Sequence, residues 1–209
     1  SDMPGVGLYV QGPEYGRTSL RSAIGQLVDY YFVAGSTADA VVAGYREITG
    51  AAPLYGKYAY GFWQCKEHYD TQDHLLTAAH GFRNRSIPVD AIVQDWHYWG
   101  DLGWGPQWDL TLYPDPAAMV RELDALSMKL MVSVWSRFDE NTQFYKDMGS
   151  KGYLLSNSTY YDAWNPQARE LFYNFSDSAH FSIGVESLWL DATEPENLPN
   201  INAKTFLGT

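Results

Sequence analysis

The sequence predicts an α/β fold built on a parallel sheet. From residue 58 onward, short apolar runs alternate with longer amphipathic runs of helical periodicity, as in parallel strands joined by crossover helices. One polar or aromatic residue stands at the end of each apolar run, where a (β/α)8 barrel places its active site: Gln64, Asp95, Trp135 and Asp191. Four such units are half of a barrel, so we predict a partial (β/α)8 barrel, the N-terminal half of a longer domain.

A flavodoxin-like sheet would show the same alternation of strands and helices. That fold binds its cofactor phosphate at a loop after the first strand. No glycine-rich loop follows the first apolar run, at 58–63, so we favour the barrel.

The residues before the barrel fall into two parts. Residues 1–35 are rich in glycine and aromatic side chains, with β-like runs at 7–10 and 26–33, and are predicted to end an upstream β-rich domain. Residues 36–57 are predicted to form a linking helix and a connector.

The linking helix is predicted between Ser36 and Gly50. Ser36 can cap its first turn and Gly50 can end it, while Val41, Tyr45 and Ile48 share one face.

The barrel portion, 58–209, contains four predicted strands and four predicted helices. The strands are expected at 58–63, 89–94, 129–135 and 184–190. The helices are expected to begin at Asp70 or Thr71, at Asp115-Pro116, at Thr142 and at Asn165-Pro166, because Asp, Thr and Asn cap helices and Pro favours the first turn.

Composition narrows the class of function. The 209 residues carry a net charge of −11 and no Lys/Arg cluster, which argues against a nucleic-acid partner. Aromatic residues make up 16% of the chain, which suits a carbohydrate site, although core packing is the better explanation of any single ring. No apolar run is long enough to span a membrane, so we expect no transmembrane helix. No metal or cofactor motif is present, so we expect no metal ion and no cofactor.

The single cysteine, Cys65, excludes an internal disulfide. Three sequons, at Asn84, Asn157 and Asn174, are compatible with secretion, whereas the first residues lack the features of a signal peptide. The compartment therefore stays open.

The stretch from Leu188 to Glu194 concentrates the chemistry. Asp191 falls where an apolar strand should end, and a carboxylate there can attack a sugar carbon to form an ester. The alternative is that Asp191 caps the following turn, because Asp favours such corners. Spacing alone favours the capping interpretation.

This stretch resembles the nucleophile signature of glycoside hydrolase family 31, and other segments match the family in order and approximate spacing. They are Gly61-Phe62-Trp63-Gln64, Ile92-Val93-Gln94-Asp95-Trp96, Trp108-Asp109, Tyr113-Pro114-Asp115-Pro116 and Val132-Ser133-Val134-Trp135. The similarity runs from about Asp29 to the end of the chain.

The resemblance implies specific roles. Asp191 corresponds to the nucleophile, with Glu194 in support. Asp95 corresponds to the residue that grips sugar hydroxyls and Trp135 to a wall of the same subsite, while Trp96 and Trp189 are expected beside the substrate. Family members carry Lys or another residue at the position of Trp189, so its role stays open. The family's acid/base Asp, together with an Arg and a His of the site, lies downstream of the positions present here.

The expected activity is a retaining α-glycoside hydrolase acting on α-linked xylosides or glucosides. The segment from Gln94 to Asp101 resembles the α-xylosidase branch of the family more than the α-glucosidases. The alternatives are an α-glucan lyase of the same family and an inactive carbohydrate-binding fragment. The expected partner is an oligosaccharide or a small α-glycoside.

Overall fold

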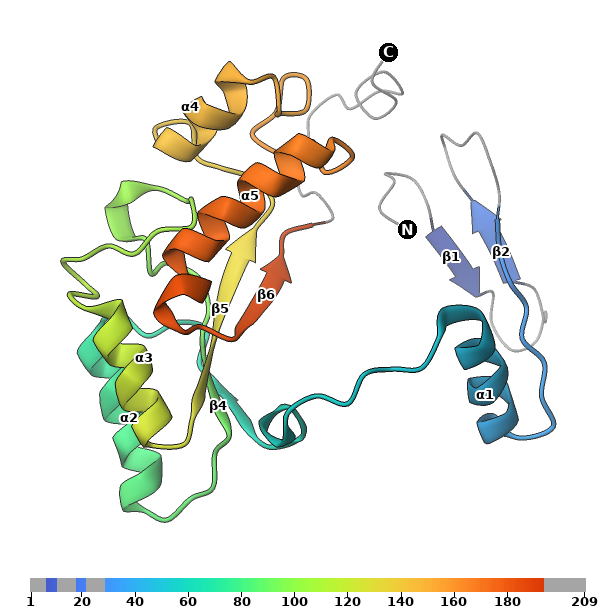
Figure 1. The fold of residues 1–209 in the computed structure, drawn as a ribbon, viewed down its shortest axis with the longest axis horizontal. Coiled ribbons are helices and arrows are strands. Elements are labelled where there is room, and N and C mark those ends of the chain that lie inside the picture. Colours follow the sequence, from blue (N-terminus) through green and yellow to red (C-terminus); the bar gives the residue numbers. More distant parts are fainter. Residues whose placement is uncertain (1–6, 11–17, 22–28, 194–209) are drawn as a thin grey trace. The chain divides into compact units, whose positions relative to one another are not determined.

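The structure is a computed structural model that describes residues 7–10, 18–21 and 29–193 (Figure 1). The chain divides into two compact units, Ser1–Gly56 and Lys57–Thr209. Each unit is described by itself.

The first unit contains a β-hairpin and a helix. Strands β1 (Gly7–Val10) and β2 (Thr18–Arg21) pair antiparallel, with Gly7 opposite Arg21. The β-like run at 7–10 is therefore confirmed. The run predicted at 26–33 is not a strand over residues 29–33, and residues 26–28 lie outside the described part of the chain.

Helix α1 (Ala38–Thr49) begins one residue later than the sequence predicted. Thr37, not Ser36, is the N-cap: its backbone is extended and its Oγ1 accepts a hydrogen bond of 3.2 Å from the backbone N–H of Ala40. Gly50 ends the helix with φ at +84°, a conformation that glycine adopts without strain. The predicted apolar face is exposed among the described residues of this unit.

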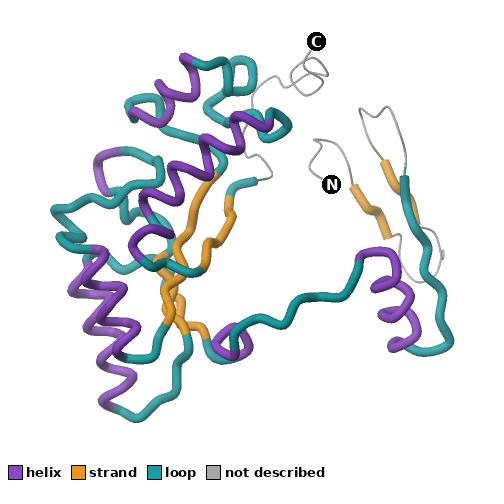
Figure 2. The backbone as a smooth tube through the Cα atoms, viewed as in Figure 1, coloured by secondary structure: helices purple, strands orange, loops and turns teal. Residues whose placement is uncertain are grey.

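The second unit is built on a four-stranded parallel sheet (Figure 2). Its strands are β3 (Trp63–Cys65), β4 (Ala91–Gln94), β5 (Lys129–Trp135) and β6 (Ser187–Asp191), side by side in sequence order. The predicted partial barrel with helical crossovers is confirmed.

The position predicted for the first strand is wrong. Residues Lys57–Tyr60 form a short 3-10 helix, η1, and the strand begins at Trp63. Asp90 fixes this start, because its carboxylate accepts a hydrogen bond of 3.0 Å from the backbone N–H of Phe62. A side chain at Gly61 would collide with Asp90, so glycine lets the chain pass close to this carboxylate.

The fourth strand also starts later than predicted, but by fewer residues than the first strand. Residues Phe181–Ile183 form the 3-10 helix η3, which ends at Gly184 with φ at +99°. Strand β6 therefore starts at Ser187 and includes Asp191 as its last residue.

Four helices connect or flank the strands of the second unit. They are α2 (Gln72–Asn84), α3 (Pro116–Ala125), α4 (Gln143–Ser150) and α5 (Pro166–Ala179). Each N-cap was predicted, and each cap side chain accepts a hydrogen bond from a backbone N–H of the first turn: Thr71, Asp115, Thr142 and Asn165. A further 3-10 turn, η2 (Gly100–Leu102), lies in the loop after β4.

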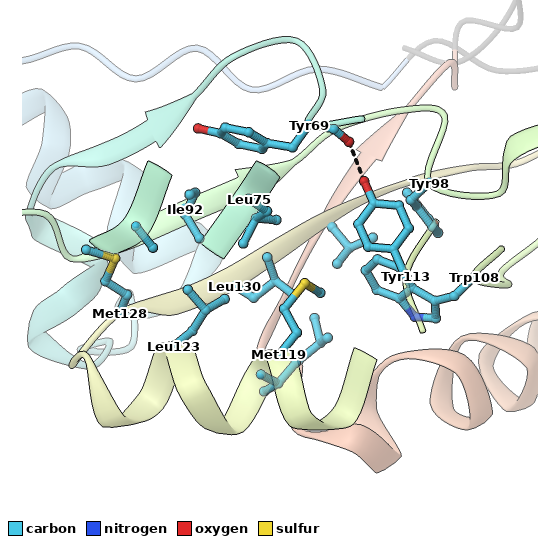
Figure 3. Packing of buried hydrophobic residues seen from close by; sticks show 14 of the residues in the cluster. Tyr69, Leu75, Ile92, Tyr98, Trp108, Tyr113, Met119, Leu123, Met128 and Leu130 are labelled. Atoms are coloured by element: carbon cyan, nitrogen blue, oxygen red, sulfur yellow. Dashed lines mark hydrogen bonds between the residues drawn. The ribbon is translucent and has the colours of Figure 1, made fainter. Parts of the chain in front are cut away.

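The hydrophobic core lies between one face of the sheet and the helices (Figure 3). Alternate residues of each strand point into it, such as Ile92 of β4 and Leu130 of β5, and they meet Leu75 of α2 and Leu123 of α3. The hydroxyl of Tyr113 donates a hydrogen bond to the backbone carbonyl of Tyr69, which ties the loop before α3 to the loop before α2. The remaining residues of each strand point to the opposite face, where they are free to form a site.

Candidate active site

The register of the sheet places the predicted site residues on the face opposite the helices. Residues paired across parallel strands share a face. Trp135 is paired with Asp191, and Ser133 is paired with Trp189. Since Gln94 is paired with Val132, Asp95 is level with Ser133.

Asp95 is half-buried just beyond the end of β4, and its surroundings raise its pKa above the ordinary value. The main cause is burial, and the negative charges of Asp191 and Glu67 add to it. The buried Ser133 hydroxyl and the backbone N–H of Trp96 act in the opposite direction because they favour the ionised carboxylate. Ser133 Oγ makes no hydrogen bond of standard geometry within the described residues, so its effect comes from proximity.

Asp191 ends β6 with its side chain exposed. Its Oδ1 accepts a hydrogen bond of 2.8 Å from the backbone N–H of Ala192, the next residue in the chain. A cap would accept a hydrogen bond from a backbone N–H two or three residues on, and within the described residues Asp191 accepts none. Its Oδ2 has no hydrogen bond within the described residues and remains available to a substrate. The Ser136 hydroxyl donates to the Ala192 carbonyl over 3.3 Å and joins the ends of β5 and β6.

The register puts the two carboxyl groups on one face of the sheet, because Asp191 is paired with Trp135 and Asp95 is level with Ser133, two residues before Trp135. This placement was the condition on which the barrel interpretation depended.

Trp135 is the last residue of β5 and belongs to an aromatic group at the strand ends. Its ring centroid lies 4.9 Å from that of Trp99 and 5.2 Å from that of Trp104. The guanidinium carbon of Arg137 lies 5.0 Å from the Trp135 ring centroid. Trp135 is thus held by neighbours on several sides.

The structure describes two of the other three predicted site residues, Trp96 and Trp189. Trp96 is half-buried, and its Nε1 donates a hydrogen bond of 3.1 Å to Glu67 Oε1. Trp189 shares the face of Asp191, as predicted, and is 46% exposed. Glu194 lies outside the described residues.

Gln64 is the residue that the sequence assigned to the wrong face. It pairs with Ile92, which is part of the core, so its side chain points toward the helices. Cys65, one residue later, faces the site instead. Partial burial and the charge of Asp95 raise the pKa of its thiol.

Comparison with known proteins decides the family. Residues 52–207 match the family described as the glycosyl hydrolases family 31 TIM-barrel domain. This chain belongs to glycoside hydrolase family 31.

The relatives include several α-xylosidases. The α-xylosidase of Saccharolobus solfataricus is 42% identical over 173 residues, which are 82% of this chain and 24% of that protein. An α-xylosidase from a soil metagenome, solved with xylose, has a TM-score of 0.71 and 38% identity over 78% of this chain and 26% of its own. The α-xylosidase of Xanthomonas citri has a TM-score of 0.78 and 31% identity over 92% of this chain and 23% of its own. The family 31 chain thus spans about a quarter of the length of these relatives.

The structure also brings residues to these strand ends that the sequence did not single out. Glu67 reaches it from the loop after β3, Ser133 from within β5, and Arg137 from just beyond β5. Ser133 and Arg137 each lie two residues from Trp135. This spacing could have indicated both, because strand residues two apart share a face.

The described residues provide no group of three or more His, Cys, Asp or Glu side chains that could hold a metal ion. No helix within these residues is long and apolar enough to cross a membrane.

Proposed function

We propose that this chain carries the nucleophile of a retaining α-glycosidase that acts on α-linked xylosides or glucosides, and that Asp191 is this nucleophile. The observation that carries the proposal is that two strand-end carboxyl groups, those of Asp95 and Asp191, lie on one face of the sheet in a family 31 chain. Asp191 is exposed, and its Oδ2 accepts no hydrogen bond from the described residues, whereas Asp95 is half-buried.

The reaction would run in two steps. In the first, Asp191 Oδ2 attacks the anomeric carbon, the bond to the leaving-group oxygen breaks, and an acid group protonates that oxygen. In the second, water attacks the anomeric carbon of the glycosyl ester, transfers a proton to the same group and releases Asp191. The resemblance of this chain to other family 31 members implies that the acid/base group is an Asp downstream of the residues present here.

Asp95 would bind hydroxyls of the sugar next to the reacting carbon. Its partial burial fits this role, because a carboxylate that is shielded from water gains from hydrogen bonds donated by sugar hydroxyls. Trp135 would form the wall beside it, with Trp96 and Trp189 flanking the sugar and Glu194 supporting the nucleophile.

An α-xyloside is the preferred substrate. The relatives with 42% and 38% identity are named α-xylosidases, whereas a family 31 glucosidase of Pseudescherichia vulneris is 32% identical and the α-glucosidase 2 of Bacillus thermoamyloliquefaciens is 25% identical. Within this proposal, residues 1–35 end an upstream β-rich domain, residues 36–57 form a linker, and residues 58–209 contribute to the barrel.

Substitution of Asp191 tests the proposal in the full-length enzyme. Because an amide cannot form the glycosyl ester, Asp191→Asn should bind sugar but lose turnover by about 10⁴-fold or more. Asp95→Asn should reduce turnover without preventing ester formation. Asp101→Asn, an exposed loop carboxylate, is the matched control and should retain activity.

A covalent trap gives an independent measurement. A slow α-xyloside with a good leaving group should add its glycosyl mass to the peptide that contains Trp189 to Glu194. Label on Asp95 or Glu194, or normal turnover by Asp191→Asn, would refute the assignment. An unsaturated product would instead indicate the lyase, and sugar binding without any turnover would indicate a binding fragment.

A further inference from the structure

Arg137 occupies the rim of the site without an assigned role. Its guanidinium carbon lies 5.0 Å from the centroid of the Trp135 ring, close enough for a cation–π contact. The side chain is 37% exposed, so part of the guanidinium group faces solvent.

The position of Arg137 is fixed from both sides. Its backbone forms an antiparallel bridge with Tyr160. Its Nη1 lies 3.9 Å from Asp139 Oδ1, and Asp139 is itself held by the Trp104 backbone N–H, which donates to Oδ2 over 2.8 Å. The guanidinium group is therefore oriented before any ligand binds.

The hydrogen-bonding capacity of this group is unused. A guanidinium has five N–H donors, yet none makes a hydrogen bond within the described residues, since 3.9 Å to Asp139 exceeds hydrogen-bond distance. Within the described residues, Arg137 also forms no ion pair with Asp95 or Asp191. The cation–π contact with Trp135 is not a hydrogen bond and therefore leaves this capacity unused.

The location indicates what these donors bind. Arg137 lies two residues beyond Trp135, about 6–7 Å further from the sheet along an extended chain. A sugar held between Asp95 and Asp191 is level with Trp135, and its leaving group must extend outward toward solvent. Arg137 therefore lies beside the leaving group and not beside the reacting sugar.

We propose that Arg137 binds the leaving group and selects substrates in which this group is itself a hydroxyl-bearing sugar. The inference rests on the proposed glycosidase function. Sugar hydroxyl oxygens accept hydrogen bonds from the guanidinium edge, whereas an aryl leaving group offers few such acceptors. Arg137 is thus a specificity-determining residue of the site.

The test compares two α-xylosides in the full-length enzyme: a disaccharide with a sugar leaving group and phenyl α-xyloside, whose leaving group carries no further acceptor. Arg137→Met keeps an apolar stem on Trp135 but removes the donors. It should lower kcat/KM for the disaccharide about 10- to 100-fold and change that for the aryl xyloside less than about 2-fold. Arg137→Lys should restore part of the loss, and Arg121→Met, on the exposed side of α3, should change neither value.

A second measurement does not require turnover. In the Asp191→Asn background, Arg137→Met should weaken binding of the disaccharide and leave binding of xylose unchanged. Equal losses for both substrates, or no loss for the disaccharide, would overturn the assignment. If Asp191 still forms the covalent ester while the substrate ratio stays constant, only the role of Arg137 fails; if Asp191→Asn retains turnover, the proposed function fails.

Discussion

His180 should make this chain less stable in mild acid. It follows α5, is fully buried, and its Nε2 lies 3.3 Å from the hydroxyl oxygen of Tyr98. The rings of Tyr98 and Trp108 each lie 5.7 Å away. Burial disfavours the charged imidazolium and lowers the pKa of His180 to about 3, against a small opposing effect of the Ala179 backbone.

The direction and size of the effect follow from proton linkage. In the unfolded chain the His180 pKa returns to about 6.5, so the unfolded state binds the proton first as the pH falls. The contribution to stability is complete above about pH 6.5 and is lost between that pH and about 3. The slope is about 1.4 kcal/mol per pH unit, which gives a loss of about 2 kcal/mol at pH 5 relative to pH 7.

The assay is urea unfolding of the full-length enzyme at pH 7 and pH 5, followed by tryptophan fluorescence. His180→Phe removes the titrating group and should reduce the loss between the two pH values by about 2 kcal/mol. His97→Gln, at an exposed histidine, serves as the control and should leave the loss unchanged. The same pH dependence in His180→Phe and in the unsubstituted protein would refute the reasoning.

Two further predictions concern stability. Tyr98→Phe removes the hydroxyl that donates over 2.9 Å to the buried Ser133 carbonyl, so the free energy of unfolding should fall by about 1–3 kcal/mol. Tyr173→Phe, at a side chain that is 57% exposed, should change it by less than about 0.5 kcal/mol, and equal effects of the two variants would count against the buried hydrogen bond. Expressed alone, the 209 residues should aggregate, because β3 and β6 are the edge strands of the described sheet and Leu190 is 64% exposed; a soluble monomer with a cooperative melt, seen by light scattering and circular dichroism, would contradict this.

Local features of the sequence were enough to predict the helices of the second unit. Thr71, Asp115, Thr142 and Asn165 cap them as expected. A cap acts on backbone groups two or three residues away, so its signal is complete within the sequence. The alternation of strands and helices likewise predicted the parallel sheet and the common edge shared by Asp95 and Asp191.

Boundaries that depend on distant residues could not be predicted in this way. The start of β3 is set by Asp90, which binds the Phe62 backbone from 28 residues away. The apolar run at 58–63 carries no sign of that contact, so it was taken for the strand itself.

The sequence alone therefore determined the fold class, the family resemblance and the candidate residues Asp191, Asp95 and Trp135. The tertiary structure decided that Cys65 and not Gln64 shares the sheet face of Asp95, that Asp191 is exposed at the end of β6, and that Arg137 lies over Trp135. The physical reason is register: a shift of one residue moves every side chain of a strand to the other face, and pairing with the neighbouring strand sets that choice.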